Sequence, residues 1–252
     1  MILPKQKLGS TDLIVSKLGL GTVKLGRNTD VKYPHAFTIP DDKQAANLLA
    51  LSKDLNINLL DTAPAYGNSE ERLGKLLRGQ RHDWVICSKA GEEYINQQSS
   101  YDFSSTSIIK SIHASLKRLN TDYLDILLIH SDGNDETIIN QYNVFETLRA
   151  AKQQGLIRAY GMSTKTVAGG LLTVQQADVA MVTYNPEYLD ELPVIQAAAQ
   201  LNKGIFIKKA FASGKLPAAE AINFILKQPG ISSIILGTIN PEHLRANVAY
   251  AI

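Results

Sequence analysis

The chain has 252 residues, of which 44% are hydrophobic and 20% are charged, and its formal net charge is +2. This composition is that of a globular protein able to bury a large core, and it argues against intrinsic disorder. The positive charge is small and scattered along the sequence, so we expect neither a nucleic-acid partner nor a membrane partner. No protein partner is evident from the sequence.

The single cysteine, Cys87, cannot form an internal disulfide, which favours a reducing compartment. The N-terminus lacks the apolar core of a signal peptide, and no segment reaches the ~20 apolar residues of a membrane span. We therefore predict a cytoplasmic location. The length suits a single (β/α)8 barrel, which typically takes about 250 residues, so we expect one domain over residues 1–252.

The chain opens with a predicted β-hairpin over residues 8–15, where turn residues lie between apolar ones, and then alternates strand and helix patterns. The expected strands cover residues 15–22, 58–62, 84–89, 123–130, 157–163, 179–184, 204–209 and 231–236. The expected helices cover residues 42–55, 70–78, 105–119, 140–154, 166–176, 190–201, 217–227 and 241–250. Eight strands without polar alternation predict an α/β fold, a closed parallel (β/α)8 TIM barrel with a short N-terminal hairpin.

Two helix starts carry capping signals. Asn68 is followed three residues later by Glu71, which resembles a capping box. Asn240 is followed directly by Pro241, a pattern that places a cap before a proline in the first helical position. Both patterns predict where a helix begins.

Four polar residues follow apolar runs where buried strands should end: Asp61, Tyr66, Lys89 and His130. In a parallel barrel the carboxyl ends of the strands meet at one mouth, so we expect these side chains to share a site. A nearby ammonium favours the ionised form of a tyrosine and so makes it a better acid. Lys89 can supply that charge, Asp61 can hold Lys89 in place, and His130 can hydrogen-bond a substrate oxygen or relay a proton.

Each of these residues also has a structural interpretation. Tyr66 alone would more often be a packing residue, Lys89 and Asp61 a structural ion pair, and His130 a satisfied polar side chain. Their occurrence on consecutive strands at one end favours catalysis over those interpretations. Cys87, inside the strand that ends at Lys89, is expected to fill the core.

The sequence resembles the aldo/keto reductase family in four motifs that occur in order along the chain. These are LGLGT at residues 18–22, DTAPAYGNSEERLG at 61–74, SLKRLNTDYLD at 115–125 with His130 beyond, and GLIRAYGMS at 155–163. The resemblance implies a barrel that binds a nicotinamide dinucleotide in extended form, without the Gly-x-Gly-x-x-Gly loop of a Rossmann fold. It also implies that Asp61, Tyr66, Lys89 and His130 are the catalytic tetrad, and it implies no metal.

The resemblance places cofactor contacts after several strands, and some family residues are replaced here. Thr164 and Met181 occupy places where Asn and Gln are common, and Lys208 stands where a tyrosine often stacks on the nicotinamide. An aliphatic lysine stem can cover the ring while the ammonium turns away. The positions implied to bind cofactor are Thr22, Val23, Ser163, Thr164, Lys208, Lys209, Ala210, Phe211, Gly214, Gly237, Thr238, His243 and Asn247.

The last helix start bears on the choice between NADP(H) and NAD(H). By resemblance, the start of this helix binds the adenosine 2′-phosphate, and the N-terminus of a helix favours bound anions. His243 stands where arginine is frequent and Gly237 where lysine is frequent, which weakens the case for phosphate without removing it. We expect NADP(H) rather than NAD(H). The alternative interpretation is that this helix start is only capped and binds no phosphate.

The resemblance implies NAD(P)H-dependent reduction of aldehydes or ketones, with Tyr66 as general acid. Residues 25–40 bring Tyr33, His35 and Phe37 toward the predicted pocket, and the chain has no long tail after the last helix. We therefore expect an open site for a small carbonyl substrate. One alternative is a nucleotide-binding regulatory subunit of the same fold. Another is a metal-dependent hydrolase using Asp61 and His130, which the absence of a His-x-His strand end disfavours.

Overall fold

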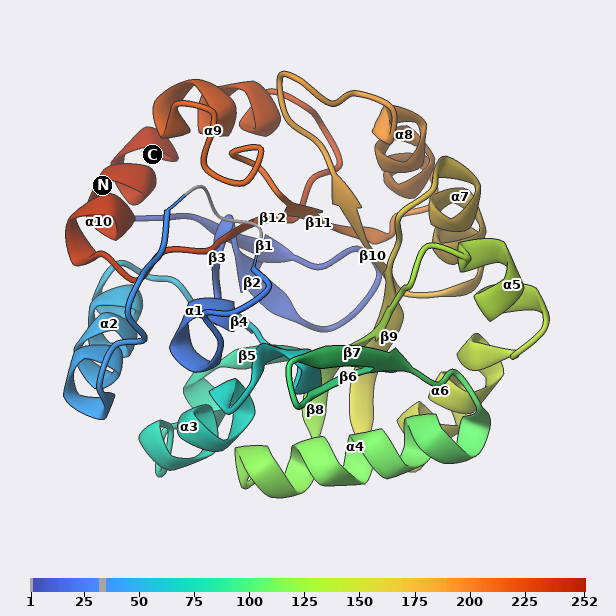
Figure 1. Ribbon diagram of the computed structural model, residues 1–252. Coiled ribbons are helices and arrows are strands. Elements are labelled where there is room, and N and C mark those ends of the chain that lie inside the picture. The colour runs from blue at the N-terminus through green and yellow to red at the C-terminus, as the bar shows by residue number, and fades with distance from the viewer. Residues whose placement is uncertain (1, 32–34) are drawn as a thin grey trace.

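The computed structural model describes residues 2–31 and 35–252, and eight parallel strands form a closed barrel at its centre (Figure 1). Their order around the barrel follows the chain, because each strand pairs with the next barrel strand and the last pairs with the first. The barrel strands are β3 (Leu18–Gly21), β4 (Leu59–Asp61), β5 (Val85–Ala90), β8 (Leu124–His130), β9 (Ile157–Ser163), β10 (Val179–Thr183), β11 (Gly204–Lys208) and β12 (Ser233–Leu236). The predicted (β/α)8 fold is confirmed.

Helices surround the barrel and bury one face each against it (Figure 1). The α-helices are α1 (Val23–Gly26), α2 (Asp42–Asp54), α3 (Ser69–Leu76), α4 (Ser105–Leu119), α5 (Asp135–Asn140), α6 (Val144–Gln153), α7 (Val167–Gln176), α8 (Leu192–Gln200), α9 (Ala218–Leu226) and α10 (Pro241–Tyr250). Two short 3₁₀ turns are η1 (Pro64–Tyr66) and η2 (Arg81–Asp83).

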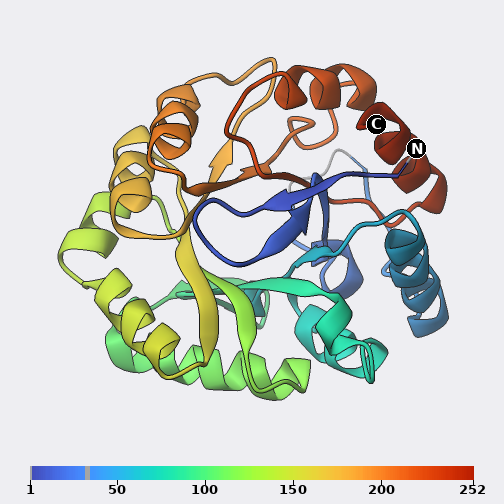
Figure 2. The same cartoon turned by 180° about the vertical axis from the view of Figure 1, so that it is seen from behind.

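An N-terminal antiparallel hairpin of β1 (Lys5–Lys7) and β2 (Ile14–Ser16) lies across the end of the barrel that faces the viewer in Figure 2. Its residues Leu8, Leu13 and Val15 are buried and pack into the barrel interior. The hairpin was predicted, but the first barrel strand was expected from residue 15 and begins at Leu18. Residues 15–16 pair with β1 instead, because their partners in the hairpin satisfy their backbone groups.

Alternation along the strands decides which side chains enter the barrel. A side chain and the one two residues later share a face, so inward apolar residues predict the direction of the strand-end residues. The inner apolar cluster contains Leu59, Val85, Cys87, Ile126, Leu128, Ala159, Val179, Met181 and Phe206. Burying one such large side chain contributes about 1.5–3 kcal/mol. The same alternation turns the residues two positions after these inward apolar side chains toward the inside of the barrel mouth.

Several short elements were not predicted. A second hairpin, β6 (Glu92–Ile95) and β7 (Gln98–Tyr101), follows β5 and turns through Asn96 and Gln97, both with positive φ. The predicted helix at 140–154 corresponds to α6, which begins at Val144 directly after Asn143 in a left-handed conformation, whereas α5 precedes it and was not predicted. Asn and Asp tolerate that conformation better than most residues.

The two capping predictions had different outcomes. Asn240 caps α10, because its Oδ1 accepts from the backbone N–H groups of Glu242 and His243 at 2.8 and 3.4 Å. The predicted capping box at Asn68 is wrong: Asn68 occupies the cap position of α3, but its side chain makes no capping hydrogen bond. Its φ of −91° and ψ of 17° depart from the extended conformation usual at a side-chain cap.

Candidate active site

Asp61 and Lys89 form a buried ion pair at the ends of adjacent strands β4 and β5. Leu59 and Cys87 line the barrel interior, so alternation turns Asp61 and Lys89 inward. Lys89 Nζ lies 2.5 Å from Asp61 Oδ1 and also donates to Thr62 O at 2.9 Å. Only 1% of Lys89 is exposed to solvent. The ammonium is thus fixed by two acceptors in a site shielded from water.

The charge on Lys89 is stabilised despite its burial. Burial alone disfavours the ammonium, but the Asp61 carboxylate beside it, together with Tyr66 and Cys87, outweighs that effect and raises the pKa of Lys89. Lys89 therefore keeps its positive charge at neutral pH. Cys87, directly below it in the strand, is buried in the inner cluster as predicted, and burial raises the pKa of its thiol.

Tyr66 stands beside this pair on η1, in the loop after β4. Its hydroxyl donates to Asp61 Oδ2 at 3.4 Å, and Lys89 Nζ lies 4.8 Å from the centre of its ring. The loop is held by a close crossing of two backbones, at Gly67 and at Gly26, the last residue of α1. A Cβ atom on either glycine would overlap the backbone of the other loop, and Gly67 also has a φ of +61°. Only glycine therefore permits this placement of Tyr66.

His130 ends β8 and faces Tyr66, with ring centres 6.2 Å apart and planes at 85°. Burial lowers the pKa of His130, Lys89 and Lys208 act in the same direction, and Glu92 opposes them. The structure thus brings together all four residues predicted as the catalytic tetrad.

Glu92 was missed by the sequence interpretation and contacts His130 directly. Its Oε2 lies 2.7 Å from His130 Nδ1, within hydrogen-bond range, although the ring N–H does not point straight at the oxygen. Burial disfavours the Glu92 carboxylate, but contacts with His130, Ser99 and Tyr101 outweigh it and lower the pKa of Glu92 to about 2. Glu92 does not follow an apolar run at the end of a barrel strand. It begins the β6–β7 hairpin, which was not predicted.

The predicted cofactor residues at the first strand are Thr22 and Val23. Thr22 is fully buried, and its hydroxyl donates to Asp61 O at 2.9 Å and accepts from Ser69 Oγ at 2.8 Å. Its side chain therefore ties β3, β4 and α3 together. Val23 starts α1 and is half-buried beside the mouth.

Lys208, Ser163 and Thr164 meet on the opposite side of the mouth, at the ends of β11 and β9. Lys208 Nζ donates to Ser163 Oγ at 2.9 Å and to Thr164 O at 2.5 Å. Thr164 Oγ1 is buried and has no hydrogen-bond partner among the described residues. A buried hydroxyl in that state is a ready donor or acceptor for a bound ligand.

Lys208 and Glu191 influence each other through charge. Burial lowers the pKa of Lys208 to about 8, although Glu191 opposes this. Burial raises the pKa of Glu191 to about 7, although Lys208 and the backbone N–H of Thr183 oppose this. Both groups therefore change charge close to neutral pH.

The loop after β11 contains Lys209, Ala210, Phe211 and Gly214. Phe211 O accepts from the N–H groups of Gly214 and Lys215 at 2.7 and 2.9 Å, which closes a tight turn. Lys209, Ala212 and Ser213 have φ values of +53°, +44° and +62°, which are uncommon for residues other than glycine. Such conformations concentrate at ligand sites. Ala210 is buried and Lys209 is exposed.

The predicted phosphate site surrounds the start of α10. Gly237 and Thr238 follow β12 and are half-buried, His243 is exposed, and Asn247 is buried. The first-turn amides of Glu242 and His243 are already occupied by Asn240. A phosphate bound here would therefore be held mainly by side chains. The backbone amides would contribute less than those of a helix N-terminus without a capping side chain.

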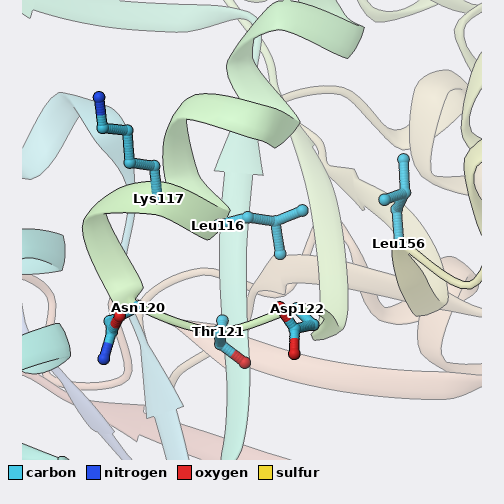
Figure 3. Close-up of a pocket in the computed structure, with 6 residues that line it drawn as sticks. All are labelled: Leu116, Lys117, Asn120, Thr121, Asp122 and Leu156. Carbon is cyan, nitrogen blue, oxygen red and sulfur yellow. The ribbon is translucent and has the colours of Figure 1, made fainter.

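Other features lie outside this site. A hollow of about 580 Å³ lies near the starts of β8 and β9, at the barrel end opposite the tetrad (Figure 3). It is lined by Leu116, Lys117, Asn120, Thr121, Asp122 and Leu156. Within residues 2–31 and 35–252, no three His, Cys, Asp or Glu side chains are grouped to hold a metal ion. No helix in the same residues is long and apolar enough to span a membrane.

The fold and the site agree with one family. Residues 17–220 match the model of the aldo/keto reductase family, and the chain belongs to that family. It is therefore an NAD(P)H-dependent oxidoreductase with a (β/α)8 fold, and members of the family use nicotinamide cofactors.

Several relatives match over nearly the whole chain. PA4992 from Pseudomonas aeruginosa, solved as a candidate aldo-keto reductase, is 55% identical with a TM-score of 0.92, covering 98% of this chain and 94% of its own. The holo form of AKR11C1 from Bacillus halodurans is 25% identical with a TM-score of 0.80, covering 98% and 90%. The NADH-specific methylglyoxal reductase of Escherichia coli is 26% identical, covering 97% and 92%.

Proposed function

We propose that this protein reduces small aldehydes and ketones to alcohols, with Tyr66 as the general acid. The observation that carries the proposal is the placement of the Tyr66 hydroxyl 3.4 Å from Asp61 Oδ2, beside the buried Asp61–Lys89 pair. A phenol next to a fixed cation is stabilised in its ionised form, so it gives up its proton more readily. The His130 ring packs edge-on against the same phenol ring, with ring centres 6.2 Å apart.

Each residue of the tetrad has a separate task. Lys89 holds a positive charge near the phenol, and Asp61 keeps that charge in place. Tyr66 delivers a proton to the carbonyl oxygen, which contributes about 10² to 10⁴ in rate for a well-placed acid. His130 contacts the same oxygen through its ring. A bound nicotinamide cofactor supplies the hydride for the carbonyl carbon.

The residues around the mouth fit a nicotinamide dinucleotide. The buried Thr164 hydroxyl, with no partner among the described residues, suits a carboxamide, and Ser163 lies beside it. Lys208 and Lys209 supply positive charge next to the turn at Phe211, which suits a pyrophosphate. We propose that Val23, Ala210, Gly214 and Asn247 line the same path, with Thr22 bracing it from behind.

We propose NADPH as the preferred cofactor, bound through Thr238 and His243 near Gly237. Because Asn240 occupies two first-turn amides, this preference rests on side chains more than on the helix start. The Escherichia coli relative is named as NADH-specific, so the family as a whole does not decide the choice.

A small carbonyl compound is the proposed substrate class. The segment after α1 brings Phe37 within 4.9 Å of Lys24 Nζ, and we propose that Phe37 lines one side of the mouth. Tyr33, also expected to wall the pocket, lies outside the described residues. The name of the Escherichia coli relative includes methylglyoxal, a small dicarbonyl, which supports this class. The single cysteine supports a reducing compartment such as the cytoplasm.

The proposal is tested with a panel of aldehydes, dicarbonyls and quinones, each assayed with NADPH and NADH. We expect turnover on small carbonyls, with a higher kcat/KM for NADPH. Tight cofactor binding without turnover on any carbonyl would overturn the reductase proposal and point to the nucleotide-binding regulatory role.

A further inference from the structure

The contact between Glu92 and His130 has a chemical consequence beyond the tetrad. His130 Nδ1 is buried, and the Glu92 Oε2 atom at 2.7 Å is the acidic partner that it meets. The His130 side chain as a whole remains 20% exposed. The accessible edge of the ring is therefore the one away from Nδ1, which includes Nε2.

Glu92 is held firmly for this role. Ser99 Oγ, on the paired strand of the hairpin, donates to Glu92 Oε1 at 2.7 Å, which leaves Oε2 for the histidine. The hairpin is itself tied to the loop after β3 through Tyr94. The Arg27 guanidinium lies 3.3 Å from the centre of the Tyr94 ring, and the Tyr94 hydroxyl donates to Asp30 Oδ2 at 2.7 Å.

An ionised carboxylate only accepts hydrogen bonds, so a carboxylate at Nδ1 requires a proton on Nδ1. Neutral His130 then has a lone pair on Nε2 and can only accept there. Protonated His130 carries N–H groups on both nitrogens and can donate from Nε2. One nitrogen of the ring thus changes from acceptor to donor when the ring gains a proton.

Several charged groups face His130 and Glu92. Lys89 on β5 and Lys208 on β11 disfavour a positive imidazole, Glu92 on β6 favours it, and the Tyr66 ring on η1 lies against it. Tyr101 on β7 bonds Glu92 from the other side, and burial together with Glu92 raises the pKa of Tyr101 to about 12. Glu92 is therefore the group in this set whose removal changes the proton on His130 most directly.

We propose that Glu92 is a positioning residue that fixes a proton on Nδ1 of His130, so that Nε2 donates to a carbonyl oxygen only when the ring is protonated. The inference deepens the proposed reductase function and rests on it for the direction of catalysis. It makes carbonyl reduction depend on protonated His130, while Tyr66 still supplies the transferred proton.

The tautomer is tested without any activity, by ¹⁵N NMR of the histidine ring nitrogens in the wild type and in Glu92→Gln. His130 is assigned by comparison with His130→Gln. A carboxamide can donate as well as accept, so Glu92→Gln releases the tautomer. We expect neutral wild-type His130 to carry its proton on Nδ1, and the variant to shift toward the Nε2–H form. Glu93→Gln, on the exposed face of the same strand, is the matched control and should leave the spectrum unchanged.

Kinetics supply the second readout. In the wild type, kcat/KM for reduction should fall about tenfold as pH rises through the pKa of His130 measured by NMR, the value of one charge-assisted hydrogen bond. In Glu92→Gln that step should shrink to about twofold or less, because the neutral ring can then donate.

The outcomes separate the two proposals. Neutral wild-type His130 with its proton on Nε2, or a Glu92→Gln spectrum identical to that of Glu93→Gln, would overturn the role of Glu92. Absence of carbonyl turnover in a wild type with the expected Nδ1–H tautomer would instead overturn the reductase proposal and leave the tautomer assignment standing.

Discussion

Lys89 Nζ lies 2.5 Å from Asp61 Oδ1, so one buried salt bridge links β5 to β4 at the mouth of the barrel. Neither side chain has an alternative partner of opposite charge in direct contact among the described residues. The pair therefore serves stability as well as the proposed chemistry, and the two contributions can be measured separately.

Replacing Lys89 with methionine should lower both stability and activity. The change keeps similar bulk but leaves Asp61 as a buried carboxylate without its cation, which typically costs about 3–5 kcal/mol. Urea unfolding measures this loss, and reductase kcat measures the loss of the charge beside Tyr66. A Lys89→Met and Asp61→Asn double variant should recover part of the stability but not the activity. Full activity in Lys89→Met would contradict the proposed role of the ammonium.

Replacing Tyr66 with phenylalanine should remove most turnover while cofactor still binds. The ring and its edge contact with His130 remain, and only the hydroxyl is lost. We expect kcat for reduction to fall by about 10² to 10⁴. Fluorescence titration with NADPH checks that binding survives, and the exposed Tyr250→Phe serves as the control. Retention of more than about a tenth of wild-type kcat would rule out Tyr66 as the acid.

Replacing His243 with arginine should strengthen NADPH binding and leave NADH binding nearly unchanged. His243 is exposed at the start of α10, where Asn240 already occupies the nearby amides. A side-chain contact to phosphate gains about 1.5–3 kcal/mol when it is charge-assisted, or about tenfold or more in Kd. Calorimetric Kd values for both cofactors test this. Equal strengthening of NADH would show that the helix start does not read the 2′-phosphate.

As pH rises from 5 to 7, the free energy of unfolding of the wild type should fall relative to that of the Glu191→Gln variant. Burial raises the folded-state pKa of Glu191 from 4.5 to about 7, so the folded state keeps a proton that the unfolded state loses. The stabilisation is present below pH 4.5 and is lost as pH rises toward 7. We expect a relative loss of about 2 kcal/mol in urea unfolding. Parallel pH dependences of the two proteins would mean that Glu191 ionises normally.

Replacing Asp135 with alanine should destabilise the fold strongly. The buried Asp135 carboxylate accepts from the N–H groups of Lys165 and Thr166, from the Thr166 hydroxyl and from Ser131. Removing it leaves the buried Ser131 hydroxyl and three partly buried donors unpaired, at about 1–3 kcal/mol for each donor that water cannot reach. Urea unfolding should show a loss of about 3 kcal/mol or more. Glu136→Ala, exposed on the same helix, is the control and should change stability by less than about 0.5 kcal/mol.

The barrel and the proximity of Asp61, Tyr66, Lys89 and His130 were predictable, because the hydrophobic period and the strand ends can be recognised in the sequence. Runs of apolar residues buried on both faces indicate parallel strands, and alternation from Cys87 to Lys89 or from Leu128 to His130 gives the inward direction. The motif resemblance added the family, which the match over residues 17–220 confirms.

Other features depend on contacts that local patterns do not encode. Glu92 reaches His130 from a hairpin whose turn, Asn96 and Gln97, lacks the glycine that usually marks such turns. The absent side-chain cap at Asn68 and the late start of α6 after Asn143 are also decided by surrounding structure. Whether an isolated asparagine caps or breaks a helix depends on backbone conformation that its neighbours in space impose.

The backbone crossing at Gly26 and Gly67 gives two residues without side chains a control over the position of Tyr66. Neither glycine has any functional group, yet a single added methyl at either would push the two loops apart and carry the phenol away from Asp61. Displacements of about 1 Å at a reacting group can reduce rate about a hundredfold. A variant at these sites would therefore behave as a poor catalyst whose catalytic residues are all intact.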